Sequence, residues 1–204
     1  MQWVVEPAAL DWVNERVSEF SANQVSSLVP SGFEAYARIS HPHRVESAAV
    51  LVEVLRSYTG AGERCWFASW EGYGWVWGGI VTFSTDPATH GLSPEPDELP
   101  VPAKVRDGPR ARRPHRGYVL YTGGLGDALV LGDLDYPWRH RTPIPAITTE
   151  VPDLWWPESR AWFVASDTDL EHCTYLGGTR VLVDQVVAEP RLDATPVDPC
   201  DPLL

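Results

Sequence analysis

DLWWPESRAWFVASDTD, residues 153–169, contains two aromatic runs divided by a short polar segment, and it ends in two aspartates. The run from Ala161 to Ser166 is dense in aromatic and β-branched residues, which predicts a buried central strand. Trp155 and Trp156 are expected to close one end of the core, because aromatic side chains bury large areas. The stretch therefore predicts a β-sheet around which the other elements are arranged.

The composition favours one domain over residues 1–204. The chain is 44% hydrophobic and contains ten tryptophans, enough for a well-packed core. Its net charge of -12 argues against unspecific binding to nucleic acid or to an anionic membrane, and it is compatible with a basic protein partner. No run reaches the roughly 18 apolar residues of a membrane span, and no signal peptide or metal spacing of the three cysteines is visible. We therefore expect a cytoplasmic protein with free thiols and no membrane association.

Local patterns predict an α+β fold, a single domain with a central mixed or antiparallel sheet. N-terminal and C-terminal helices are expected to pack on this sheet. The predicted helices cover residues 7–20, 46–58 and 180–189. The predicted strands cover residues 33–39, 65–70, 116–123, 128–134 and 161–166. Gly177 and Gly178 are predicted to form a turn, after which Thr179 caps the last helix.

Residues 86–116 form a long Pro/Arg-rich segment with seven prolines and no clear periodicity. Residues 104–116 carry six basic residues and one acidic residue, a local charge of +5 that leaves -17 on the rest of the chain. The composition predicts an irregular, solvated loop, which lies against the acidic body or reaches an acidic partner. A nucleic-acid-binding arm is disfavoured, because the segment lacks interleaved aromatic residues.

Two stretches are candidates for a small-ligand site. In SDTD, Asp167 and Asp169 are two residues apart and point to the same side of an extended chain, where they could hold a cation or act as a base. The same spacing occurs in GDLD (132–135), and turn formation is an alternative explanation for both pairs.

In YLGGTR, the backbone of Gly177 and Gly178 and the start of the helix at Thr179 and Arg180 favour an anionic ligand. Arg160 is a second candidate to hold the anionic group of such a ligand.

The remaining motifs are weaker. TGGLGDA (122–128) lacks the Lys-Ser/Thr of a phosphate-binding loop, and His41 and His43 lack further ligands for zinc. No cofactor and no metal is assigned, and the absence of a known catalytic motif leaves catalysis open while favouring a binding protein. The WEGYGW segment supplies Trp70, Glu71, Tyr73 and Trp75 as candidate partner-binding residues, provided that their side chains are exposed.

Several segments together resemble a family of uncharacterised actinobacterial proteins. They are VPSGFEAYARISHP, CWFASWEGYGW, RGYVLYTG and DLWWPESRAWFVASDTDLEHCTYLGGTR. This resemblance implies no activity and no catalytic residues. The layout of the elements is also similar, at the level of fold alone, to bacterial immunity proteins including the SUKH superfamily, which would imply a protein partner. The predicted function is a non-enzymatic binding protein, and the alternative is a small-molecule binder or enzyme with a pocket near Asp167 and the helix start at Thr179.

Overall fold

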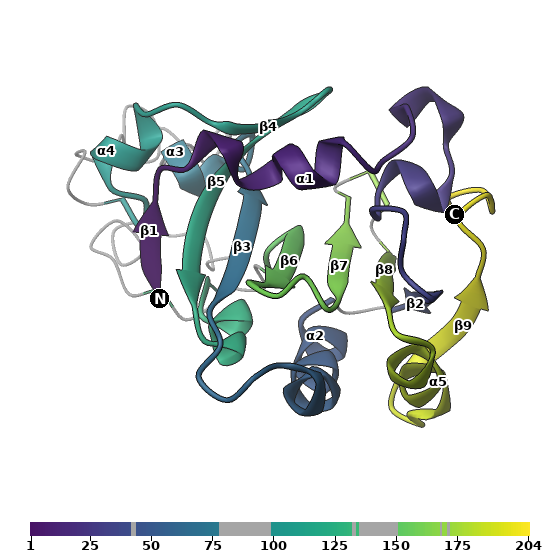
Figure 1. Ribbon diagram of the computed structural model, residues 1–204. Helices are drawn as coiled ribbons and strands as arrows, with labels where there is room; N and C mark the ends of the chain where they lie inside the picture. Colours follow the sequence, from purple (N-terminus) through teal and green to yellow (C-terminus); the bar gives the residue numbers. More distant parts are fainter. Residues whose placement is uncertain (42–43, 78–98, 132–133, 135–150, 168, 171) are drawn as a thin grey trace, which may run out of the picture.

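The computed structural model describes residues 1–41, 44–77, 99–131, 134, 151–167, 169–170 and 172–204 (Figure 1). These residues form one sheet of nine strands in which every pairing is antiparallel, so the α+β prediction and its antiparallel form are confirmed. The strand order is β1-β5-β3-β6-β7-β8-β2-β9, and β4 pairs with β5. The strands are β1 (Gln2–Val4), β2 (Ala35–Ser40), β3 (Cys65–Trp70), β4 (Ala111–Arg113), β5 (Arg116–Gly123), β6 (Leu154–Pro157), β7 (Phe163–Ser166), β8 (Cys173–Gly178) and β9 (Asp193–Val197).

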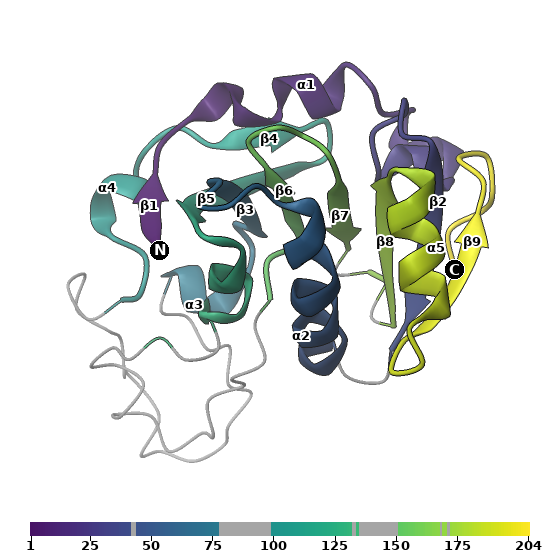
Figure 2. The same cartoon turned by 60° about the horizontal axis from the view of Figure 1, so that its bottom comes forward.

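Helices cover both faces of this sheet. One face carries α2 (Arg44–Leu55), α5 (Arg180–Ala188) and the short 3-10 helix η7 (Leu125–Leu129), and Figure 2 shows α2 and α5 side by side. The other face is crossed by η1 (Pro7–Leu10) and α1 (Asp11–Asn14), which η2 (Phe20–Ala22) and η3 (Val25–Ser27) follow in the chain. The remaining described helices are η4 (Arg56–Tyr58), α3 (Gly74–Trp77) and α4 (Ala103–Arg106).

The opening stretch supplies side chains to both cores. Trp155 and Trp162 lie in the core under α2 and α5, whereas Trp156 and Phe163 lie in the core under α1. Consecutive strand residues point to opposite faces, so the two adjacent tryptophans are divided between the cores. All four side chains are at most 2% exposed. Antiparallel strands are usually buried on one face only, and burial on both faces explains the unbroken apolar runs in this sequence.

Two predicted elements are wrong. The helix expected over residues 7–20 ends at Asn14, because the Ser18 amide donates to Ser26 O at 2.8 Å instead of continuing the helix. The strand expected over residues 128–134 does not form over residues 128–131: residues 128 and 129 belong to η7, and residues 132 and 133 lie outside the described part of the chain. The Asp127 carboxylate accepts the Gly124 amide at 3.1 Å, which is a helix-start arrangement.

The predicted turn at Gly177 and Gly178 is also corrected, because both residues belong to β8. A Cβ atom at Gly177 would lie 2.5 Å from the Phe33 side chain and 2.9 Å from that of Val29, so glycine is needed there for close packing. Thr179 does cap α5 as predicted, since its hydroxyl accepts the Leu182 amide at 3.3 Å.

Cys65, Cys173 and Cys200 are free thiols, and only Cys200 is exposed. Burial, followed by the carboxylates of Glu63 and Asp127, raises the pKa of Cys65 to about 12. This thiol is therefore protonated and unreactive near neutral pH. In the described part of the chain, no helix has the length and apolar character needed to cross a membrane.

Candidate functional site

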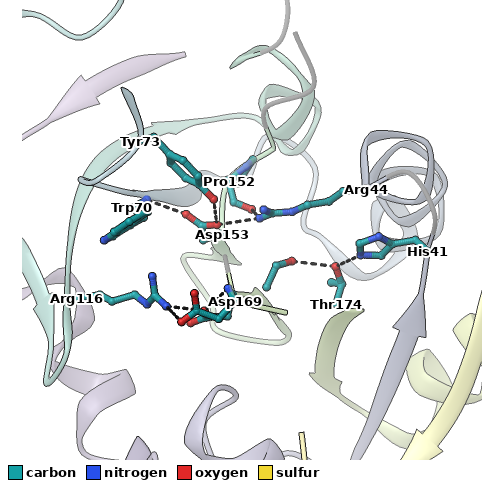
Figure 3. A network of polar contacts seen from close by, with 11 residues as sticks. His41, Arg44, Trp70, Tyr73, Arg116, Pro152, Asp153, Asp169 and Thr174 are labelled. Atoms are coloured by element: carbon teal, nitrogen blue, oxygen red, sulfur yellow. Dashed lines mark hydrogen bonds and ion pairs between the residues drawn. The ribbon is translucent and has the colours of Figure 1, made fainter. Parts of the chain in front are cut away.

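Polar side chains gather at one edge of the sheet, where β2, β3 and β7 end and β5, β6 and β8 begin. Because neighbouring strands are antiparallel, the ends of some and the starts of others meet at the same edge. We call this the polar edge. Its members are His41, Arg44, Trp70, Tyr73, Arg116, Asp153, Ser166, Asp167, Asp169 and Thr174 (Figure 3).

Asp153 is the centre of the largest network at the polar edge. Its carboxylate is buried and accepts hydrogen bonds from the Trp70 amide and the Tyr73 hydroxyl, both at 2.7 Å. The guanidinium of Arg44, at the start of α2, donates to the same carboxylate at 3.1 Å and to Pro152 O at 2.8 Å. We call Asp153 with Arg44, Trp70 and Tyr73 the Asp153 clasp. It joins β6, β3 and α2 through one side chain.

The charges in the clasp compensate each other. Burial lowers the pKa of Arg44, but Asp153 and Tyr73 raise it by more, so the net shift is upward and the guanidinium stays charged. A buried carboxylate is tolerated when a cation and several donors satisfy it. These contacts account for the ionised pair without any ligand.

Asp167 and Asp169 form a second network with Arg116 at the start of β5. One terminal nitrogen of Arg116 lies 2.7 Å from a carboxylate oxygen of each aspartate. Asp167 also accepts the Asp169 amide at 2.9 Å, and its side chain is 3% exposed against 76% for Asp169. The guanidinium carbon of Arg116 lies 5.1 Å from the Trp70 ring centroid. The predicted carboxylate pair therefore does converge, and it converges on an arginine of this chain.

The third network is a chain of three side chains that joins β2, β7 and β8. His41 Nε2 lies 2.9 Å from the Thr174 hydroxyl, which lies 2.8 Å from the Ser166 hydroxyl. His41 is buried, and its Nδ1 atom has no hydrogen-bond partner among the residues that the structure describes. Burial, followed by the charge of Arg44, lowers the pKa of His41 below its ordinary value of 6.5. The imidazole is therefore neutral in the folded protein near neutral pH.

This shift predicts acid sensitivity. The unfolded chain takes up a proton at His41 near pH 6.5, while the folded protein resists it, so stability is unaffected above that pH and falls below it. The loss has an upper limit of about 1.4 kcal/mol for each pH unit. Urea titrations at pH 7.5 and 5.5 measure it, and His41→Gln, which can still bond to Thr174, is expected to show a smaller loss. An equal loss in both proteins would contradict the prediction. His115 has a lowered pKa as well, but both proteins contain it.

The aromatic turn, which we define as residues 70–77, lies directly after β3. The predicted partner-binding residues Trp70, Tyr73 and Trp75 are partly buried and pack on each other. Tyr73 packs edge-on against Trp70 with ring centroids 5.5 Å apart and stacks on Trp75 at 6.2 Å. Glu71 is also partly buried, and its carboxylate accepts from Arg110 Nε at 3.0 Å. The prediction of a partner-binding site required these four side chains to be exposed, and they are only partly exposed.

Trp77 is an exposed aromatic residue that the sequence did not single out as a candidate. Its side chain is 47% exposed, its indole nitrogen donates to Glu71 O at 2.6 Å, and the Arg110 guanidinium carbon lies 5.5 Å from its ring centroid. In the sequence, VW follows WEGYGW. The four-residue spacing of Tyr73 and Trp77 places both on one side of a helical turn, and this spacing could have indicated Trp77 as a candidate.

The predicted ligand residues Gly177, Gly178, Thr179 and Arg180 lie at the opposite ends of the strands from the polar edge. Phe163 of β7 pairs with Gly177 and Ser166 pairs with Thr174, so Asp167 and Gly177 are at opposite ends of these strands. The Arg180 amide at the start of α5 donates to the Glu34 carboxylate at 2.9 Å, which occupies the expected anion position.

Arg160 is also at the opposite edge, in the turn between β6 and β7. It has a positive φ of 58°, and its guanidinium carbon lies 4.9 Å from the Trp12 ring centroid. The structure therefore does not unite the predicted ligand residues in one pocket.

The Pro/Arg-rich segment is ordered in its second half, which corrects the prediction of an irregular loop for residues 99–116. Here the chain forms α4, β4 and the start of β5, with β4 paired to β5, and two of its arginines bind protein oxygens. Arg110 donates to Val105 O at 2.8 Å and Gly108 O at 2.7 Å, and Arg113, 4% exposed, donates to Ser27 O and Leu28 O. The guanidinium groups of Arg110 and Arg113 are therefore engaged within the protein, whereas Lys104 and Arg112 are exposed. Residues 86–98 lie outside the described residues.

TGGLGDA borders a cleft of about 380 Å³. Its lining residues are Met1, Gln2, Gly62, Glu63, Arg64, Thr122, Gly123 and Gly124. The motif's own Asp127 accepts the Gly124 amide, so an acidic side chain stands where a phosphate would need a free donor. Among the described residues, no three His, Cys, Asp or Glu side chains are grouped to hold a metal ion. Asp133, Asp135 and His43 lie outside the described part of the chain.

No family model, no curated protein and no solved structure matches the chain. The fold and the site define an α+β protein with one antiparallel sheet, Trp-rich aromatic clusters and a polar edge built from paired charges.

Proposed function

We propose that the protein is a non-enzymatic binding protein that holds a protein partner through the aromatic turn, with Trp77 as the anchor. One observation carries this proposal: Trp77 is 47% exposed and yet fixed by a hydrogen bond and by a guanidinium over its ring. Tryptophan is among the residues that contribute most at protein interfaces.

The turn is pre-organised, which favours binding because little conformational entropy is lost on association. The Asp153 clasp fixes Trp70 and Tyr73, and Arg110 holds the Glu71 carboxylate. A rigid, half-exposed indole is a large contact surface with few free torsions.

Charge supports a basic partner. In the N-terminal segment the carboxylates of Glu6, Asp11, Glu15 and Glu19 are exposed, and none pairs with a cationic side chain in the described part of the chain. With a net charge of -12, such a surface steers a basic partner and makes association faster at low salt. An immunity-like role in the cytoplasm, in which the partner is a basic toxin domain, is one form of this proposal.

Affinity capture tests the proposal. Tagged protein is exposed at low salt to lysate of the organism from which the sequence comes, using wild type, Trp77→Ala and Val181→Ala. Val181 is a matched control, since it is 68% exposed and lies on α5, away from the turn. We expect a stoichiometric partner with wild type and with Val181→Ala, and at least about thirtyfold weaker binding with Trp77→Ala. Equal capture by Trp77→Ala, or no stoichiometric partner for wild type, would count against the proposal.

The small-molecule alternative has weaker support. A base or anion anchor must be free to act, whereas Asp167 is paired with Arg116 and the Arg180 amide with Glu34.

A further inference from the structure

We infer that Asp153 is the positioning residue of the aromatic turn: a buried carboxylate that does not touch the partner decides whether Trp77 is presented. The contact network stands by itself, and its consequence for binding rests on the proposed function.

Asp153 fixes the turn at two points. One carboxylate oxygen accepts the Trp70 amide and the other accepts the Tyr73 hydroxyl, both at 2.7 Å. The chain between these two residues must therefore bend back toward β6. The ring of Tyr73 then packs against Trp70 on one side and Trp75 on the other.

The path continues from the clasp to Trp77. The Tyr73 carbonyl accepts the Val76 amide at 3.0 Å, which begins the helical turn that carries Trp77. The Glu71 carbonyl, which lies between the two fixed points, accepts the Trp77 indole N–H at 2.6 Å. The backbone end of Trp77 thus depends on a group that the clasp positions. Its indole end depends on Glu71, whose own amide donates to Gly117 O of β5 at 2.9 Å.

Asp153 itself is rigidly placed. Its amide donates to Ala68 O at 2.8 Å and its carbonyl accepts the Ser166 amide at 2.7 Å, so its backbone belongs to the sheet between β3 and β7. Arg44 grips the carboxylate from α2. The clasp therefore fixes the position of the aromatic turn relative to both the sheet and α2.

Arg110 is a second support, and it acts on Trp77 and Glu71 rather than on Tyr73. Its guanidinium carbon lies 5.5 Å from the Trp77 ring centroid. It holds the Glu71 carboxylate at 3.0 Å, and no contact of Arg110 with Tyr73 appears among the described residues. Loss of Asp153 should therefore loosen the backbone from Tyr73 to Trp77 while Glu71 stays attached.

Hydrogen exchange measured by mass spectrometry tests the inference without any partner. The variants are Tyr73→Phe, which removes the hydrogen bond from the Tyr73 hydroxyl to Asp153, and Asp153→Asn, which removes the charge of the carboxylate. Asp169→Asn is the control, because it alters the exposed carboxylate of the neighbouring network. We expect exchange in the peptide covering residues 70–77 to be about tenfold faster in Tyr73→Phe and faster still in Asp153→Asn. In the control it should be unchanged.

The location of the effect separates positioning from general destabilisation. A positioning role raises exchange in residues 70–77, including the Val76 amide, while peptides of β2 and β8 keep their protection. Unchanged exchange in residues 70–77, or an equal rise everywhere in Tyr73→Phe, would overturn the inference.

Binding by the same variants distinguishes this inference from the proposed function. If exchange rises as expected but Trp77→Ala binds the captured partner normally, the proposed function fails and the positioning role stands. If Trp77→Ala abolishes capture but the exchange pattern is unchanged, only the inference fails. If both hold, Tyr73→Phe should weaken capture although it leaves Trp77 in place.

Discussion

Trp162→Ala lowers the free energy of unfolding by about 3–5 kcal/mol, as expected for loss of a large aromatic side chain from a packed core. Trp162 is 0% exposed and packs edge-on against Trp155, with ring centroids 5.8 Å apart and an interplanar angle of 81°. Its indole nitrogen also donates to the Thr59 hydroxyl at 3.1 Å, which ties β7 to the segment after α2. The replacement removes the ring, its contacts and this bond together.

Urea unfolding followed by far-UV circular dichroism measures the effect of Trp162→Ala. Trp77→Ala is the matched control, because it makes the same chemical change at a side chain that is 47% exposed. We expect the control to cost less than about 1 kcal/mol. A Trp162→Ala protein as stable as the control would mean that the two-core packing described here is wrong. The control also establishes that Trp77→Ala is folded when its binding is measured.

Local sequence patterns were sufficient to predict β3 and β5, whereas β6 and β8 were not predicted as strands. Residues 65–70 and 116–123 were predicted with the bounds that β3 and β5 have. Runs of aromatic and β-branched residues between glycines carry this information within one segment. The Thr179 cap was predictable for the same reason, since a cap involves only the next few residues.

The Asp153 clasp was not predictable, because its partners are distant in the sequence. Trp70, Tyr73 and Arg44 are separated from Asp153 by 83, 80 and 109 residues. Asp153 begins the stretch DLWWPESRAWFVASDTD, and the paired spacing that marks a candidate site belongs to Asp167 and Asp169 at its other end. A single acid before an aromatic strand gives no sign that it will be buried.

The arginine-rich segment shows a similar limit. Composition treats every arginine as solvated charge, but Arg110 and Arg113 turn inward to backbone carbonyls. Every residue has a backbone carbonyl, so no sequence motif shows which carbonyls an arginine will bind. The antiparallel register of β7 and β8 likewise separated Asp167 from Gly177, although only ten positions divide them in the chain.

Asp153→Leu is expected to lower the free energy of unfolding by about 3–5 kcal/mol, because removing one member of a buried pair leaves the other without compensation. Arg44 would keep its charge while losing the carboxylate that offsets its burial, and the Trp70 amide and Tyr73 hydroxyl would lose their acceptor.

The double variant Arg44→Met/Asp153→Leu tests this reason, again by urea unfolding. Removing both charges should recover part of the loss, since an apolar pair of similar volume is tolerated where a lone buried charge is not. Adding Tyr73→Phe removes a further unsatisfied group and should recover more. If the double variant is less stable than Asp153→Leu alone, then Arg44 contributes through packing along α2 and its bond to Pro152 O, and the clasp is not governed by charge compensation.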